Sequence, residues 1–107
     1  MNPIKSAPDC QNLGDIRHAI DELDQQLVAL LARRLTYVQS ATRFKADEQS
    51  IPAPERVVVM LEARRLWAAN AGLPVDETED FFRDLIHWFI NQQITHWRRL
   101  HPEGAEQ

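Results

Sequence analysis

The feature that most constrains the fold is a long stretch near the N-terminus without helix-breaking residues. From Asp15 to Lys45 the chain contains neither glycine nor proline, and apolar residues recur at alternating spacings of four and three. This spacing is typical of one continuous face of an amphipathic helix. We therefore expect a single helix from Asn12 to about Lys45, roughly 50 Å long at about 1.5 Å per residue. The positions of this seam are Ile16, Ile20, Leu23, Leu27, Leu30, Arg34, Tyr37 and Ala41.

Such a helix is too long for a chain of 107 residues to cover. A compact domain of this size has a radius of gyration of only about 13 Å, so much of the seam would face water. A second copy of the chain is the simplest source of a helix of matching length, related by a two-fold axis. The sequence thus predicts an interlocked homodimer.

Local signals mark the ends of the first two helices. Asn12 is a typical N-cap residue, and Asp15 follows it at the spacing of a capping box. Pro54 suits the first turn of a second helix. Gly72 suits the left-handed residue that ends this helix.

A third helix is expected to open at a capping box in residues 76–79 and to continue to about Leu100. The valine run at residues 57–59 has strand propensity, but an isolated strand would lack a partner. The predicted fold class is therefore all-α, a three-helix chain with a long first helix. We expect an N-terminal arm over residues 1–11, a helical domain over residues 12–100 and a flexible tail over residues 101–107.

Composition excludes several functional classes. A net charge of −4 and a pI near 5.5 argue against a nucleic-acid-binding protein. The apolar runs are too short to span a membrane, and residues 1–5 do not resemble a signal peptide. Cys10 is the single cysteine, and the four histidines lack metal-ligand spacing, so we expect no metal site. The interpretation is a cytoplasmic protein.

Polar residues interrupt two apolar faces. Arg34 lies in the first seam and Gln93 in the face of the third helix, while Lys45 follows Arg34 by three helical turns. Each has an ordinary structural explanation. Arg34 could form an ion pair in the core, Gln93 could bind a backbone carbonyl, and Lys45 could be a solvated surface lysine. Arg17 could likewise pair with Asp21 one turn later. Together, however, Arg34, Lys45 and Gln93 indicate a cationic pocket for a small polyanion.

These residues resemble a known family, the all-helical chorismate mutases, from about Leu13 to Trp97. Within that family the chain is most similar to the isochorismate pyruvate lyase branch, which makes salicylate for siderophores. The resemblance implies an intertwined homodimer of three-helix chains and no cofactor. It is carried by Asp15-Ile16-Arg17, Arg33-Arg34, Arg43-Phe44-Lys45-Ala46, Ile51-Pro52-Ala53-Pro54-Glu55-Arg56 and Ile86-His87-Trp88 with Gln93.

The resemblance also implies roles for individual residues. Arg34 would bind one carboxylate of the dianionic substrate isochorismate, and Arg17 would reach the site from the neighbouring subunit. Arg56 matches a further arginine of the family pocket. Lys45 and Gln93 would be the catalytic residues, acting at the ether oxygen and enolpyruvyl end. The segment 46–53 that follows Lys45 would act as a lid.

One departure favours the lyase over the mutase. The mutases usually carry a glutamate directly after the second-helix arginine, where it binds the ring hydroxyl of chorismate, but this chain has Val57 there and Ala53 upstream. Loss of a hydrogen-bond acceptor discriminates strongly against a substrate hydroxyl. The alternatives are a chorismate mutase, with weak mutase activity possible even in a lyase, and a non-catalytic helical dimerisation or ligand-sensing module.

Overall fold

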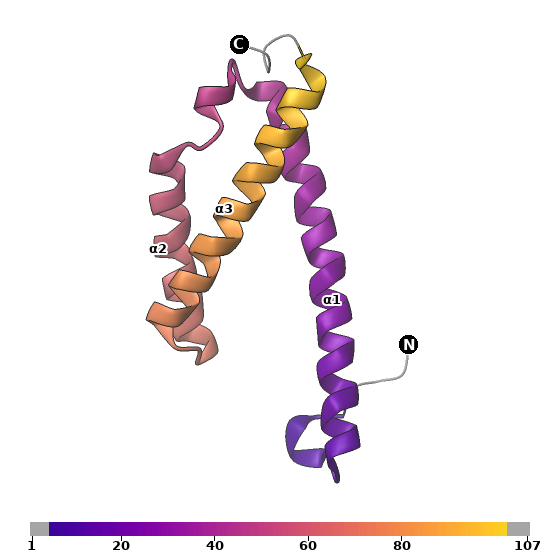
Figure 1. The fold of residues 1–107 in the computed structure, drawn as a ribbon. Coiled ribbons are helices and arrows are strands. Elements are labelled where there is room, and N and C mark those ends of the chain that lie inside the picture. The colour runs from indigo at the N-terminus through magenta and orange to yellow at the C-terminus, as the bar shows by residue number, and fades with distance from the viewer. Residues whose placement is uncertain (1–4, 103–107) are drawn as a thin grey trace. The chain divides into compact units, whose positions relative to one another are not determined.

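The computed structural model describes residues 5–102, and all the regular elements in this part of the chain are helical. The expectations for residues 1–4 of the arm and 103–107 of the tail lie outside the described residues. Three α-helices confirm the all-α prediction (Figure 1). They are α1 (Leu13–Ser40), α2 (Pro54–Ala71) and α3 (Val75–Leu100), with short 3-10 turns η1 (Ala7–Asp9), η2 (Ala41–Phe44) and η3 (Glu48–Ser50).

The chain divides between Thr36 and Tyr37 into two compact units, which are described separately below. Among the described residues, no helix has the length and apolar character needed to cross a membrane.

The start of α1 follows the sequence prediction in part. The Asn12 side-chain oxygen accepts a hydrogen bond from the Asp15 N–H at 2.9 Å, so Asn12 is the expected cap. The Asp15 carboxylate accepts instead from the Gln11 N–H at 3.0 Å and from Lys5 at 3.1 Å. The hydrogen bond from Gln11, and then that from Lys5, lower the pKa of Asp15 below its ordinary value.

The end of α1 differs from the prediction. The helix ends at Ser40, continues as η2 to Phe44, and leaves Lys45 with extended backbone at φ −100° and ψ 132°. The Thr42 hydroxyl donates to the Gln39 carbonyl at 2.6 Å. Such a side-chain hydrogen bond competes with the backbone hydrogen bonds that would continue the α-helix beyond Ser40. The prediction that Lys45 lies three helical turns beyond Arg34 on one face is therefore wrong.

The apolar seam of α1 is exposed in the single chain, as its length predicts. None of the residues of α1 is buried. The exposed fraction is between 50% and 70% at several seam positions, namely Ile20, Leu23, Leu27, Leu30 and Tyr37.

In the second unit, α2 and α3 form a hairpin that contains most of the core (Figure 1). Gly72 has φ 76° and Leu73 N–H donates to the Ala68 carbonyl at 2.9 Å, which is the expected left-handed helix end. The short connection turns the chain back on itself, so the apolar faces of both helices meet. The buried apolar residues are Ile51, Leu61, Ala68, Ile86 and Phe89.

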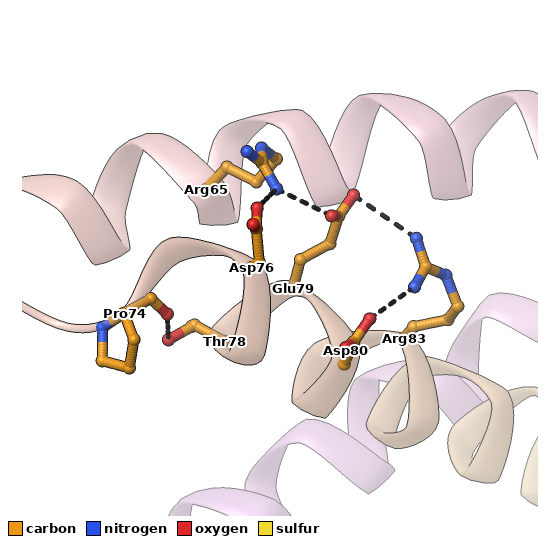
Figure 2. Close-up of polar contacts among 7 residues, drawn as sticks. All are labelled: Arg65, Pro74, Asp76, Thr78, Glu79, Asp80 and Arg83. Atoms are coloured by element: carbon orange, nitrogen blue, oxygen red, sulfur yellow. Dashed lines mark hydrogen bonds and ion pairs between the residues drawn. The ribbon is translucent and has the colours of Figure 1, made fainter.

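The capping box expected at residues 76–79 does not form. Helix α3 begins at Val75 with Pro74 as its cap, and the Thr78 hydroxyl donates to the Pro74 carbonyl at 2.7 Å. Asp76 and Glu79 instead bind Arg65 of α2 (Figure 2). The acidic side chains thus pair with a cation on the facing helix instead of with backbone N–H groups at the start of their own helix.

Candidate active site

Lys45 lies at the junction between η2 and the segment expected to act as a lid. Its side chain is half-buried, and its ammonium donates a hydrogen bond to the Ser50 carbonyl at 3.3 Å. Its backbone N–H donates to the Thr42 carbonyl at 3.2 Å. The lysine is therefore held from both ends by the turn that surrounds it.

The segment 46–53 is a folded turn. The Asp47 carboxylate caps η3 by accepting from the Ser50 N–H at 2.9 Å, and the Ser50 hydroxyl donates back to the Asp47 carbonyl at 2.8 Å. Ile51 is only 3% exposed and anchors the turn in the core. These contacts hold the segment expected to act as a lid in one folded conformation.

Ala53 joins this turn to α2 in a strained conformation. Its φ of 40° and ψ of 65° place it in the left-handed region, although it has a side chain and precedes Pro54. Such a conformation costs on the order of 1–3 kcal/mol. The Ala53 carbonyl accepts hydrogen bonds from Arg56 N–H at 3.0 Å and Val57 N–H at 3.2 Å. It thereby fixes the first turn of α2, from which the exposed Arg56 projects.

Gln93 is buried in α3, as predicted. It is 7% exposed and follows Ile86 and Phe89 on the buried face of the helix. Within residues 5–102 its side-chain amide forms no hydrogen bond. Its amide nitrogen and oxygen are not fully enclosed, so they remain accessible to a polar ligand atom.

Arg17 and Arg34 both belong to α1 in the first unit. The helix is unbroken between them, so seventeen residues separate them by about 25 Å along its axis. Arg17 is exposed and Arg34 is half-buried, while the neighbouring Arg33 is exposed as expected. One small substrate cannot reach both arginines of the same helix.

A hollow of about 420 Å³ lies between the 46–53 turn, the start of α2 and the middle of α3. Val57 lines it, which places the residue that departs from the mutase pattern at a cavity wall. The predicted residues Lys45, Arg56 and Gln93 are not among its lining residues. The hollow is lined by Pro52, Pro54, Val57, His87, Ile90 and Asn91.

Sequence reasoning missed His87 and Asn91 as lining residues and Arg64 as a further cation beside Arg56. The spacing of His87, Ile90 and Asn91 on one side of α3 was the available signal. The Arg64 guanidinium lies 4.6 Å from the centre of the Trp67 ring and 5.8 Å from that of Phe82. No comparable sequence pattern pointed to Arg64.

Arg64 makes the middle of α2 positively charged. Its Nη1 donates to the Met60 carbonyl at 3.3 Å, while its Nε is buried without a hydrogen-bond partner in the described part of the chain. Burial lowers the pKa of Arg64, and repulsion from Arg56 lowers it further. An anion near these two guanidinium groups would relieve that repulsion.

Metal binding has no support in the arrangement of acidic, histidine and cysteine side chains. Among residues 5–102 there is no group of three such residues close enough to hold an ion.

Comparison with known proteins agrees with this architecture. The model of the family described as chorismate mutase type II matches residues 16–94. The isochorismate pyruvate lyase of Pseudomonas aeruginosa is 49% identical over 96 residues, which cover 90% of this chain and 95% of that protein. The T-protein of Haemophilus influenzae is 44% identical over 66% of this chain, and that of Enterobacter agglomerans is 33% identical over 82%.

The two kinds of relative differ in how far they extend. This chain corresponds to 19% and 24% of the lengths of the two T-proteins, but to nearly all of the lyase. The match to the family model covers α2, most of α1 and α3, and every candidate site residue from Arg17 to Gln93. On this evidence the chain belongs to the chorismate mutase type II family.

Proposed function

We propose that this chain is an isochorismate pyruvate lyase, which converts isochorismate to salicylate and pyruvate. The observation that carries the proposal is the 49% identity, over nearly the full length of both chains, to the lyase of Pseudomonas aeruginosa. Val57 supports it, because it is an apolar residue at the position, directly after Arg56, where the mutases usually carry a glutamate. Salicylate for a siderophore would be its biological product.

The proposed reaction is a pericyclic elimination. The hydrogen on C2 of the ring passes to the enolpyruvyl methylene while the C3–O ether bond breaks, which leaves the aromatic salicylate and pyruvate. The bonds that form and break all belong to one substrate molecule, so the reaction needs no external base, nucleophile, metal or cofactor. The protein contributes by holding the reactive conformer and by stabilising negative charge that develops on the ether oxygen.

Each candidate residue has a role in this scheme. Arg34 and Arg56 bind the carboxylates, together with Arg17 from the second subunit. Lys45 donates to the ether oxygen, and Gln93 binds the enolpyruvyl end. The unpaired amide of Gln93 supports a polar ligand, and the proximity of the Arg56 and Arg64 guanidinium groups supports an anionic one at this unit.

A homodimer follows from the same proposal. The apolar seam of α1 is at least half exposed at Ile20, Leu23, Leu27 and Leu30, and a second α1 is a partner of matching length. Because Arg17 lies about 25 Å from Arg34, a second subunit is also the simplest source of Arg17 for the site. The proposed domain spans residues 12–100, with an arm before it and a tail after it, in the cytoplasm.

A chorismate mutase is the second candidate, which the family match favours. The first experiment gives the purified protein isochorismate and chorismate separately, with a metal chelator present. Salicylate fluorescence from isochorismate, with little prephenate from chorismate, supports the lyase. Rapid prephenate formation contradicts it and supports the mutase. The absence of both products supports a binding module.

The second experiment replaces Lys45 with alanine. We expect salicylate formation to fall at least about 100-fold, because the ammonium would stabilise charge on the ether oxygen. Tm should change little, because the one hydrogen bond that the ammonium makes, to the exposed Ser50 carbonyl at 3.3 Å, contributes little to stability. Arg43→Ala is the matched control, since Arg43 is an exposed cation two residues away. Equal loss in both variants would contradict the role of Lys45.

A further inference from the structure

An ion pair joins the Lys45 turn to the C-terminal end of α3. One carboxylate oxygen of Glu48 accepts from both Nε and Nη2 of Arg98, each at 2.6 Å. The two residues are fifty positions apart in the sequence. The pair therefore connects η3 to the C-terminal end of α3, two segments that are far apart in the sequence.

The turn η3 connects Glu48 to the group that binds the Lys45 side chain. Glu48 and Ser50 are the first and last residues of η3, which Asp47 caps. The Ser50 carbonyl is the acceptor for the Lys45 ammonium. A displacement of Glu48 therefore moves the group that holds the lysine.

The other end of the pair belongs to the helix that carries Gln93. Arg98 follows Gln93 by five residues, which is about 7.5 Å along α3. The helix is continuous between them, so it behaves as one rigid element over this distance. The ion pair thus ties the Lys45 turn to the element that positions the second proposed catalytic side chain.

We propose that Arg98 and Glu48 are positioning residues for Lys45, and that their ion pair sets where the ammonium lies relative to Gln93. The inference rests on the lyase function proposed above. Arg98 is largely exposed, with 58% of its side chain accessible, so the pair contributes little to global stability. The ion pair instead determines the position of η3 and of the Ser50 carbonyl that binds Lys45.

The test compares Arg98→Met, Glu48→Gln and the charge-exchanged double variant E48R/R98E. Arg99→Met is the matched control, because Arg99 is exposed, adjacent and without an ion pair among the described residues. We expect kcat for salicylate formation to fall about two- to five-fold in each single variant, with KM nearly unchanged. The double variant should recover most of this loss, and Arg99→Met should behave as the wild type.

Hydrogen exchange provides a readout that is independent of activity. The amides of residues 46–51 should exchange faster in Arg98→Met than in Arg99→Met, while the amides of residues 86–93 should not change. In a Lys45→Ala background, Arg98→Met should cause no further loss of residual kcat, because the pair acts through the lysine.

Three results would overturn the proposal. Arg98→Met could match Arg99→Met in both kcat and exchange, or the turn could loosen with kcat unchanged, or Arg98→Met could still lower kcat without Lys45. A wild-type protein that forms no salicylate would instead contradict the proposed function. That failure is distinguishable, because it appears before any variant is made.

Discussion

Arg65 of α2 and Glu79 of α3 are joined by an ion pair of 2.8 Å across the helix hairpin (Figure 2). The same guanidinium nitrogen lies 2.9 Å from the Asp76 carboxylate, and Arg83 binds Glu79 from the other side at 3.3 Å. The hydrogen bonds from Arg65, first to Asp76 and then to Glu79, raise the pKa of Arg65. This network closes the end of the hairpin where Gly72 turns the chain.

Replacing Arg65 with methionine is expected to lower Tm by a few degrees, because Asp76 and Glu79 lose their shared cation while the apolar stem is retained. Calorimetry at low and high salt would measure the change, which should shrink as salt screens the pair. Glu77→Gln is the control, since Glu77 is exposed and lies outside the network. A similar loss for both variants would contradict the assignment.

The N-terminus of α1 should lose stability in acid. A carboxyl whose pKa is lowered by folding contributes stability above its ordinary value of 3.8, and this contribution is lost as the pH falls through the lower folded value. Thermal unfolding of wild type and Asp15→Asn across this range would test the effect. The difference in Tm between them should be largest above the ordinary value and vanish in strong acid.

Gln93→Leu separates a catalytic role from a structural one. Because the amide forms no hydrogen bond within residues 5–102, replacing it with an apolar side chain of similar size should leave Tm unchanged or raise it. Salicylate formation should fall at least about 100-fold, as for other buried groups aimed at developing charge. Unfolding, or loss of the proposed dimer, would indicate the binding module instead.

Val57→Glu should move the activity toward the mutase. Val57 lines a hollow of about 420 Å³, which has room for a longer side chain, and a carboxylate there would offer an acceptor to the ring hydroxyl of chorismate. We expect the ratio of prephenate to salicylate to rise about ten-fold or more. Val58→Glu, at an exposed neighbouring position, is the control. An unchanged ratio would remove Val57 from the specificity argument.

Part of the candidate site was predictable from the sequence. The helical periodicity around Gln93 placed its amide on a buried face, and the structure confirms it at 7% exposed. The position of Lys45 was not predictable in the same way, because it depended on α1 continuing beyond Ser40. His87 and Asn91 join Val57 at the hollow only because α2 and α3 pack together.

The sequence by itself determined the features that depend on contacts within one helical turn. Asn12 caps α1, Pro54 opens α2 and Gly72 ends it, because the groups that satisfy each helix end lie within about four residues. The apolar spacing of α1 likewise determined that its seam would exceed what one chain can cover.

Only the tertiary structure decided which distant groups replace the local ones. Arg65 takes the acids that could have capped α3, and Glu48 meets an arginine fifty residues away. Ala53 keeps a left-handed backbone between a core anchored by Ile51 and the first turn of α2. The ion pairs join residues that are far apart in the sequence, and the left-handed backbone of Ala53 persists against a cost on the order of 1–3 kcal/mol, so spacing along the chain predicts none of them.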